Sequence, residues 1–164
     1  MTNERDDLIE ALQERRQFLR HTLEGLSEEQ AGVRSTVSAL CVGGLVKHVA
    51  DVEEAWAGFM VGGADAMNEV GARQDYEAAF RMDPGDTVES VLAHYADVAA
   101  RTDELIRTLP DLGVSYPLPD QPWFPPNSSW SARRVVLHMI GETAHHSGHA
   151  DIIREMIDGA KTMG

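Results

Sequence analysis

The sequence has one cysteine, few basic residues and no long apolar run. The single cysteine, Cys41, cannot form a disulfide within the chain, so we expect a reducing compartment and a cytoplasmic protein. No stretch of about 20 apolar residues occurs, so no membrane-spanning helix is expected. The charged segment 1–7 lacks the apolar core of a signal peptide, so no secretion signal is expected there.

Basic residues are also few in comparison with acidic ones. The chain has 14 Lys+Arg and 27 Asp+Glu, which gives a formal net charge of −13 at pH 7. Nucleic acids and anionic membrane surfaces both attract clustered Lys and Arg, so neither is expected as a partner. We interpret the acidity as favouring solubility. The length of 164 residues predicts a single domain, residues 1–164.

Apolar residues recur at the 3–4 spacing that is typical of amphipathic helices. The helices are expected at residues 4–26, 42–60, 86–109 and 131–159. The first apolar stripe is interrupted by Arg15 and Thr22, and residues 27–30 resemble a capping box. Asp86 is the predicted N-cap of the third helix, and Gly159 is the predicted C-terminal cap of the fourth. Gly43 and Gly44, near the start of the second helix, would permit another segment to approach closely.

Two long connections join these helices. The first, residues 61–85, is rich in glycine and is expected to contain a helical turn around residues 76–80. The second, residues 111–130, holds five of the seven prolines, which excludes a helix or a central strand. This proline-rich segment could form part of a functional site or only cap the bundle end. Because no strand pattern is found, we predict an all-α four-helix bundle with long connections after helices 2 and 3.

The inward stripe of the fourth predicted helix is polar in its middle. Its residues, at 3–4 spacing, are Val135, Met139, Glu142, His146, His149, Ile153 and Met156. A carboxylate and imidazoles in a core position are costly unless they are paired or bind a metal. Glu142 and His146 stand at i and i+4, so their side chains can converge on one point. His48, on the inner face of the second helix, is the candidate third ligand.

Other interpretations fit the same residues. His48 could be a hydrogen-bonded core histidine, and Glu142 with His146 could form a solvated helix pair. His145 and His149, also at i and i+4, form a rival pair of ligands. Residue types and spacing alone therefore favour a metal site no more than they favour these structural roles.

Two segments resemble motifs of the actinobacterial branch of the DinB/YfiT-like superfamily. Residues 43–53 (GGLVKHVADVE) resemble its second-helix motif, and residues 138–155 (HMIGETAHHSGHADIIRE) resemble its fourth-helix motif. This branch includes mycothiol-dependent S-transferases and maleylpyruvate isomerase. The resemblance covers nearly the whole chain and places zinc ligands on His48, Glu142 and His146. The sequence departs from its relatives at His145, where they usually carry arginine, so His145 and His149 remain alternate ligands.

The resemblance also implies an activity. A divalent metal, zinc, would bind mycothiol as a thiolate, which then attacks an electrophilic small molecule in a detoxification reaction. The alternatives are a metal-dependent hydrolase that uses the same site and a non-enzymatic metal-binding bundle. Cys41 is expected to be a buried filler rather than a reactive thiol. A homodimer is left open, as is the identity of the electrophile.

Overall fold

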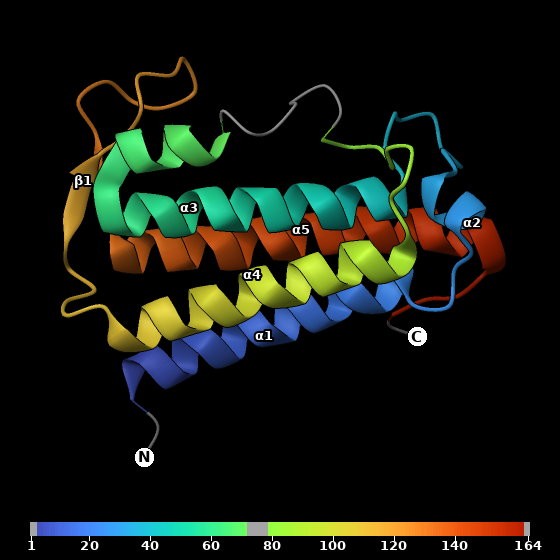
Figure 1. Ribbon diagram of the computed structural model, residues 1–164, viewed down its shortest axis with the longest axis horizontal. Helices are drawn as coiled ribbons and strands as arrows, with labels where there is room; N and C mark the ends of the chain where they lie inside the picture. The colour runs from blue at the N-terminus through green and yellow to red at the C-terminus, as the bar shows by residue number, and fades with distance from the viewer. Residues whose placement is uncertain (1–2, 72–78, 163–164) are drawn as a thin grey trace.

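Four long helices lie side by side in the computed structural model, which describes residues 3–71 and 79–162 (Figure 1). A short helix follows the first, and a pair of three-residue antiparallel strands precedes the last. The elements are α1 (Glu4–Leu23), α2 (Glu28–Gly32), α3 (Val42–Gly71), α4 (Val88–Thr108), β1 (Ser115–Pro117), β2 (Ser129–Ser131) and α5 (Ala132–Asp158). This architecture confirms the all-α bundle with long connections after its second and third long helices.

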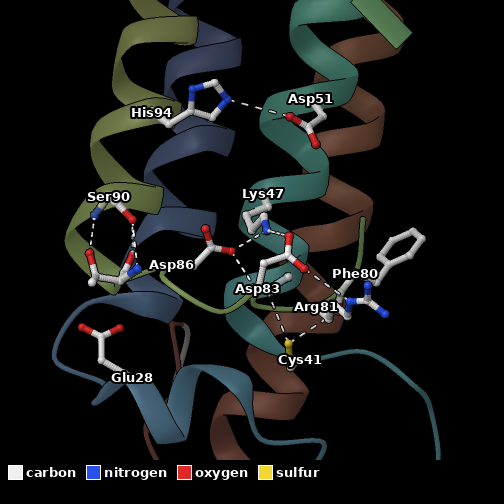
Figure 2. A network of polar contacts seen from close by, with 12 residues as sticks. Glu28, Cys41, Lys47, Asp51, Phe80, Arg81, Asp83, Asp86, Ser90 and His94 are labelled. Atoms are coloured by element: carbon white, nitrogen blue, oxygen red, sulfur yellow. Dashed lines mark hydrogen bonds and ion pairs between the residues drawn. The ribbon is translucent and has the colours of Figure 1, made fainter. Parts of the chain in front are cut away.

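Several helix ends follow from local hydrogen bonds that the sequence predicts. The Ser27 hydroxyl accepts a hydrogen bond from the Gln30 backbone N–H, and the Gln30 side-chain oxygen accepts one from the Ser27 backbone N–H. The predicted capping box therefore begins α2. Gly159 caps α5 in the left-handed conformation, with φ 77°. The predicted N-cap of α4 is wrong by one residue, because Thr87 takes that role. The Asp86 carboxylate instead accepts hydrogen bonds from Lys47 and from the Asp83 backbone N–H (Figure 2).

Helix α1 is shorter than predicted and buries a different arginine. It ends at Leu23 rather than at residue 26, because Glu24 has an extended backbone. Arg15, predicted on the inner stripe, has a 37% exposed side chain, whereas Arg16 is 3% exposed. A shift of one residue turns a helical side chain by about 100°, so the inner stripe passes through Arg16.

Helix α3 is longer than predicted because a kink carries it beyond Met60. At Gly63 the backbone leaves the helical conformation, with φ 68° and ψ −152°. A side chain at this position would also meet the Tyr116 ring, whose nearest atom lies 3.0 Å from an ideal Cβ. After the kink the helix turns back over its own first part (Figure 1). The turn expected around residues 76–80 lies largely outside the described residues.

The proline-rich connection contains two strands, although no strand was expected there. β1 and β2 pair antiparallel, with Tyr116 opposite Trp130. Pro117 is the last residue of β1, where a two-stranded ribbon tolerates a residue that cannot donate a hydrogen bond. The Tyr116 hydroxyl donates to the Val61 carbonyl at 2.7 Å, which fastens the ribbon to the kink of α3.

The core is formed by two apolar clusters, and buried polar side chains accompany them on α1, α3, α4 and α5. One set of these we call the ion network, formed by Arg16, Glu53 and Asp103. The Arg16 guanidinium donates to the Glu53 carboxylate at 2.6 and 3.0 Å and to Asp103 at 2.7 Å. Gln13 donates to the second Asp103 oxygen at 2.7 Å. One cation thus joins carboxylates from α3 and α4 to α1.

Candidate metal centre

Three side chains from two helices converge in the described part of the molecule, and we call them the His–Glu cluster. His48 comes from α3, and Glu142 and His146 come from α5. Each offers one ligand atom, and these three atoms lie within 4.8 Å of one another. His146 Nε2 lies 3.1 Å from Glu142 Oε1, and the rings of His48 and His146 meet edge-on at 5.0 Å. Among residues 3–71 and 79–162, no other three His, Cys, Asp or Glu side chains form such a group.

The glycines at the start of α3 determine what covers this cluster. An ideal Cβ on Gly44 would lie 2.1 Å from the Phe80 backbone, so only glycine lets that segment lie against the helix. The Phe80 ring then packs on His48, with ring centroids 4.1 Å apart. The close approach expected at Gly43 and Gly44 is therefore present, since a Cβ on Gly43 would meet Met82 Sδ at 2.3 Å.

The electrostatics of the cluster leave electron pairs available. Burial lowers the pKa of His48 to about 4, so its imidazole is neutral at pH 7. The hydrogen bond with His146 lowers the pKa of Glu142 in spite of burial, so Glu142 is a carboxylate. Two imidazole nitrogens and a carboxylate oxygen are ligands that zinc takes in catalytic sites, where a further position stays open. The donor set therefore fits a zinc ion.

The alternate ligands occupy different positions. His145 is exposed, and its ring lies 4.6 Å from that of His149. His149 Nδ1 lies 3.5 Å from His146 Nδ1, behind the cluster rather than in it. Burial lowers the pKa of His149. The structure thus brings together His48, Glu142 and His146 and leaves the rival pair outside, while the ligand assignment itself stays a prediction.

The His–Glu cluster forms part of the wall of a cavity of about 640 Å³. The proline-rich loop contributes Trp123 and Phe124 to the lining, and α3 contributes Trp56. Trp56 stacks on Trp130 at 5.1 Å and 17°, which holds its ring in place. His138 also lines the cavity and meets Trp56 edge-on at 4.9 Å.

Sequence reasoning missed part of this cavity. Met67 and Asn68 line it from the part of α3 beyond the kink, which was assigned to a connection. The sequence gives one indication that the helix continues past Met60, which is that residues 61–71 contain no proline. For the proline-rich segment, the functional alternative gains support from the two aromatic side chains that it adds to the cavity.

Comparison with known proteins identifies the family of the chain. The family model described as mycothiol-S-transferase matches residues 7–159. The chain belongs to this family. The resemblance to the DinB/YfiT-like superfamily is thereby confirmed. No protein with a curated description matches this member of the family.

A solved structure has a similar fold. The crystal structure of a conserved protein from Enterococcus faecalis superposes with a TM-score of 0.72, covering 98% of this chain and 100% of that one. The two sequences are 16% identical, so this likeness speaks for the fold alone. Within the described residues of this family member, no helix combines the length and the hydropathy needed to cross a membrane.

Proposed function

We propose that this protein is an enzyme that uses zinc, held by His48, Glu142 and His146, to transfer mycothiol to an electrophilic small molecule. The observation that carries the proposal is the convergence of three ligand atoms at the wall of a cavity of about 640 Å³. A cavity of this size suits a sugar-bearing thiol and a second substrate, and membership of the mycothiol-S-transferase family names the thiol.

The roles of the residues follow from their positions. A zinc ion at this site would lower the pKa of a bound thiol toward or below neutrality, which favours the thiolate. His48 and His146 would supply imidazole ligands, and the Glu142 carboxylate would add a negative charge that offsets part of the charge of the cation. Sulfur then forms a bond to the electrophilic carbon, and the displaced electron pair leaves with the leaving group or moves onto a neighbouring atom, which takes up a proton.

The chain offers no cysteine nucleophile of its own to compete with the external thiol. Cys41 is 1% exposed, and its Sγ donates to the Phe80 carbonyl at 3.5 Å and accepts from the Gly44 N–H at 3.4 Å (Figure 2). This is the buried filler that the sequence predicted. The electrophile must therefore react with a thiol that enters the cavity from solution.

The cavity lining indicates the class of electrophile. Trp56 lies two helical turns from His48, about 12 Å along α3 at 1.5 Å per residue. Together with Phe124 and Trp123 it gives the cavity an apolar, aromatic wall beside the metal site. Apolar, aromatic walls of this kind bind apolar ligands. We therefore expect apolar, aromatic electrophiles to be better acceptors than small polar ones.

The test is conjugation by the purified protein. Zinc-loaded protein should consume mycothiol in the presence of 1-chloro-2,4-dinitrobenzene and form the thioether, whereas protein stripped with a chelator should not. His48→Ala should lose turnover, and His21→Ala, at an exposed histidine of α1, should keep it. Glutathione in place of mycothiol tests thiol specificity. A zinc-loaded protein that ignores mycothiol with every electrophile tried would contradict the proposal.

A further inference from the structure

The ring of His146 lies between two partners, one at each nitrogen. On one side Nε2 lies 3.1 Å from Glu142 Oε1, within the His–Glu cluster. On the other side Nδ1 lies 3.5 Å from His149 Nδ1, with the two rings edge-on and their centroids 5.5 Å apart. His149 stands one turn along α5 from His146, so the helix itself fixes this contact.

A metal-binding histidine needs its second nitrogen held. A neutral imidazole carries one proton, so a lone pair on Nε2 requires the proton on Nδ1. Proteins normally give that N–H a fixed acceptor, which sets the tautomer and the orientation of the ring. In the part of the chain that the structure describes, His149 is the hydrogen-bond partner of His146 Nδ1.

We propose that His149 is a positioning residue for the metal centre. Its Nδ1 accepts the hydrogen bond of His146 Nδ1–H, which fixes His146 in the tautomer that presents Nε2 to the cation. The inference rests on the metal site of the proposed function and does not depend on which thiol or electrophile reacts there.

A histidine suits position 149 better than a carboxylate, because the hydrogen bond between His146 Nδ1 and His149 Nδ1 must reverse direction when a cation binds. Without a cation, His146 Nε2–H donates to Glu142, and His146 Nδ1 must then accept a hydrogen bond from His149 Nδ1–H. With a cation, the proton of His146 is on Nδ1, and His149 accepts while its own proton moves to Nε2. Each imidazole keeps one proton throughout. A carboxylate can only accept, so it could match only one of the two states.

The neighbouring His145 provides a matched control. Its ring lies 5.5 Å from that of His146 and 4.6 Å from that of His149. It is exposed, and no hydrogen bond to the His–Glu cluster is among its contacts in the described structure. A change that acts only through local packing or charge should therefore affect His145→Ala and His149→Ala alike.

Zinc affinity, measured without any thiol by competition with a chromophoric chelator, tests the proposal. His149→Ala should weaken zinc binding about 10- to 100-fold, the usual effect of removing the partner of a ligand. His149→Asn should restore binding to within about threefold of the wild type, because an amide can both donate and accept. His145→Ala should bind zinc as the wild type does. Circular dichroism should show the same helix content in all four proteins.

Long-range 1H–15N spectra of the histidine rings give a second readout. His146 should carry its proton on Nε2 in the metal-free protein and on Nδ1 with zinc bound. Coordination of zinc through His146 Nδ1, unchanged zinc affinity in His149→Ala, or an equal loss in His145→Ala would each overturn the inference. A wild-type protein that binds zinc as described but transfers no thiol contradicts the proposed function and leaves this inference standing.

Discussion

Two groups of polar side chains lie in the interior of the same bundle and differ in how their charges are balanced. In the ion network, every charged group meets one of opposite sign, and Arg16 is placed between Glu53 and Asp103. In the His–Glu cluster, His146 and Glu142 share one hydrogen bond, and no lysine or arginine forms an ion pair with Glu142 in the described structure. The first group is complete as the chain folds. The second offers three ligand atoms to a cation from outside.

Their surroundings differ in the same sense. The side chains of Arg16 and Glu53 are 4% and 2% exposed, so the ion network is almost fully buried. The Glu142 side chain is 27% exposed and lines the large cavity together with His48 and His146. A buried polar group whose charges are paired and closed off from solvent contributes to the fold, whereas one that lacks a cationic partner and borders a cavity is suited to binding.

The largest expected effect comes from breaking the ion network. Arg16→Met leaves Glu53 and Asp103 buried without their cation, and such a change costs roughly 3–5 kcal/mol. Urea denaturation should show this loss in the free energy of unfolding. Arg15→Met, at the exposed neighbouring position, should change it by less than about 0.5 kcal/mol. A loss below about 1 kcal/mol in Arg16→Met would show that the network is not the closed unit described above.

Breaking the His–Glu cluster should lower zinc affinity and leave the stability of the metal-free protein nearly unchanged. His48→Ala removes the only ligand from α3, so zinc affinity should fall about 100-fold or more, which corresponds to about 2.7 kcal/mol. The metal-free stability should change little, because the cavity left by the imidazole is offset by relief of its desolvation. Zinc should raise the melting temperature of the wild type but not of the variant. Equal stabilisation of both proteins by zinc would refute the assigned ligand.

The comparison can be sharpened at the cavity rim. Trp123 is 69% exposed and lines the cavity, so Trp123→Ala should leave zinc affinity and folding unchanged. It should raise KM for an aromatic electrophile about 3- to 10-fold with little change in kcat, because the contact is lost equally from the ground state and the transition state. Steady-state kinetics with an aromatic and a small polar electrophile would measure this. An equal KM increase for both would contradict an aromatic wall that selects substrates.

The sequence predicts more of the metal centre than of the ion network, and the reason is the type of residue. Histidine and glutamate in the middle of an apolar stripe are unexpected, so Glu142 and His146 are visible from α5 alone. Arg16 is one of three arginines in the segment 15–20. If the predicted helical stripe is displaced by one residue, the exposed Arg15 is taken for the buried arginine. Its partners lie 37 and 87 residues away, so no local pattern marks the pairing.

The helices themselves are largely predictable because periodicity and capping act locally. The fold-back of α3 is not, since it depends on the φ of Gly63 and on packing against Tyr116 from a distant segment. The pairing of β1 with β2 likewise depends on contacts across the proline-rich loop. The cavity is built from these long-range features, so the sequence could locate the candidate ligands but not the wall that faces them.

The smallest effect is expected at a third group, which is half-exposed. Lys47 donates to Asp83 at 2.8 Å and to Asp86, and the side chains of Lys47 and Asp83 are 19% and 41% exposed (Figure 2). Lys47→Met should therefore lower the free energy of unfolding by at most about 1 kcal/mol, as for other exposed ion pairs. Lys161→Met, at a pair whose side chains are 47% and 49% exposed, is the control and should have an even smaller effect.

The pH dependence of that effect has a definite sign. The hydrogen bond from Lys47 lowers the pKa of Asp83 below its ordinary value. The contribution of the pair is therefore complete above the pKa of Asp in the unfolded chain, about 4, and is lost as the pH falls through the lower folded value. Urea denaturation at pH 7 and at pH 3 should show the difference between wild type and Lys47→Met shrinking at pH 3. A difference that stays the same on acidification would mean that Lys47 stabilises the segment before α4 by packing rather than by charge.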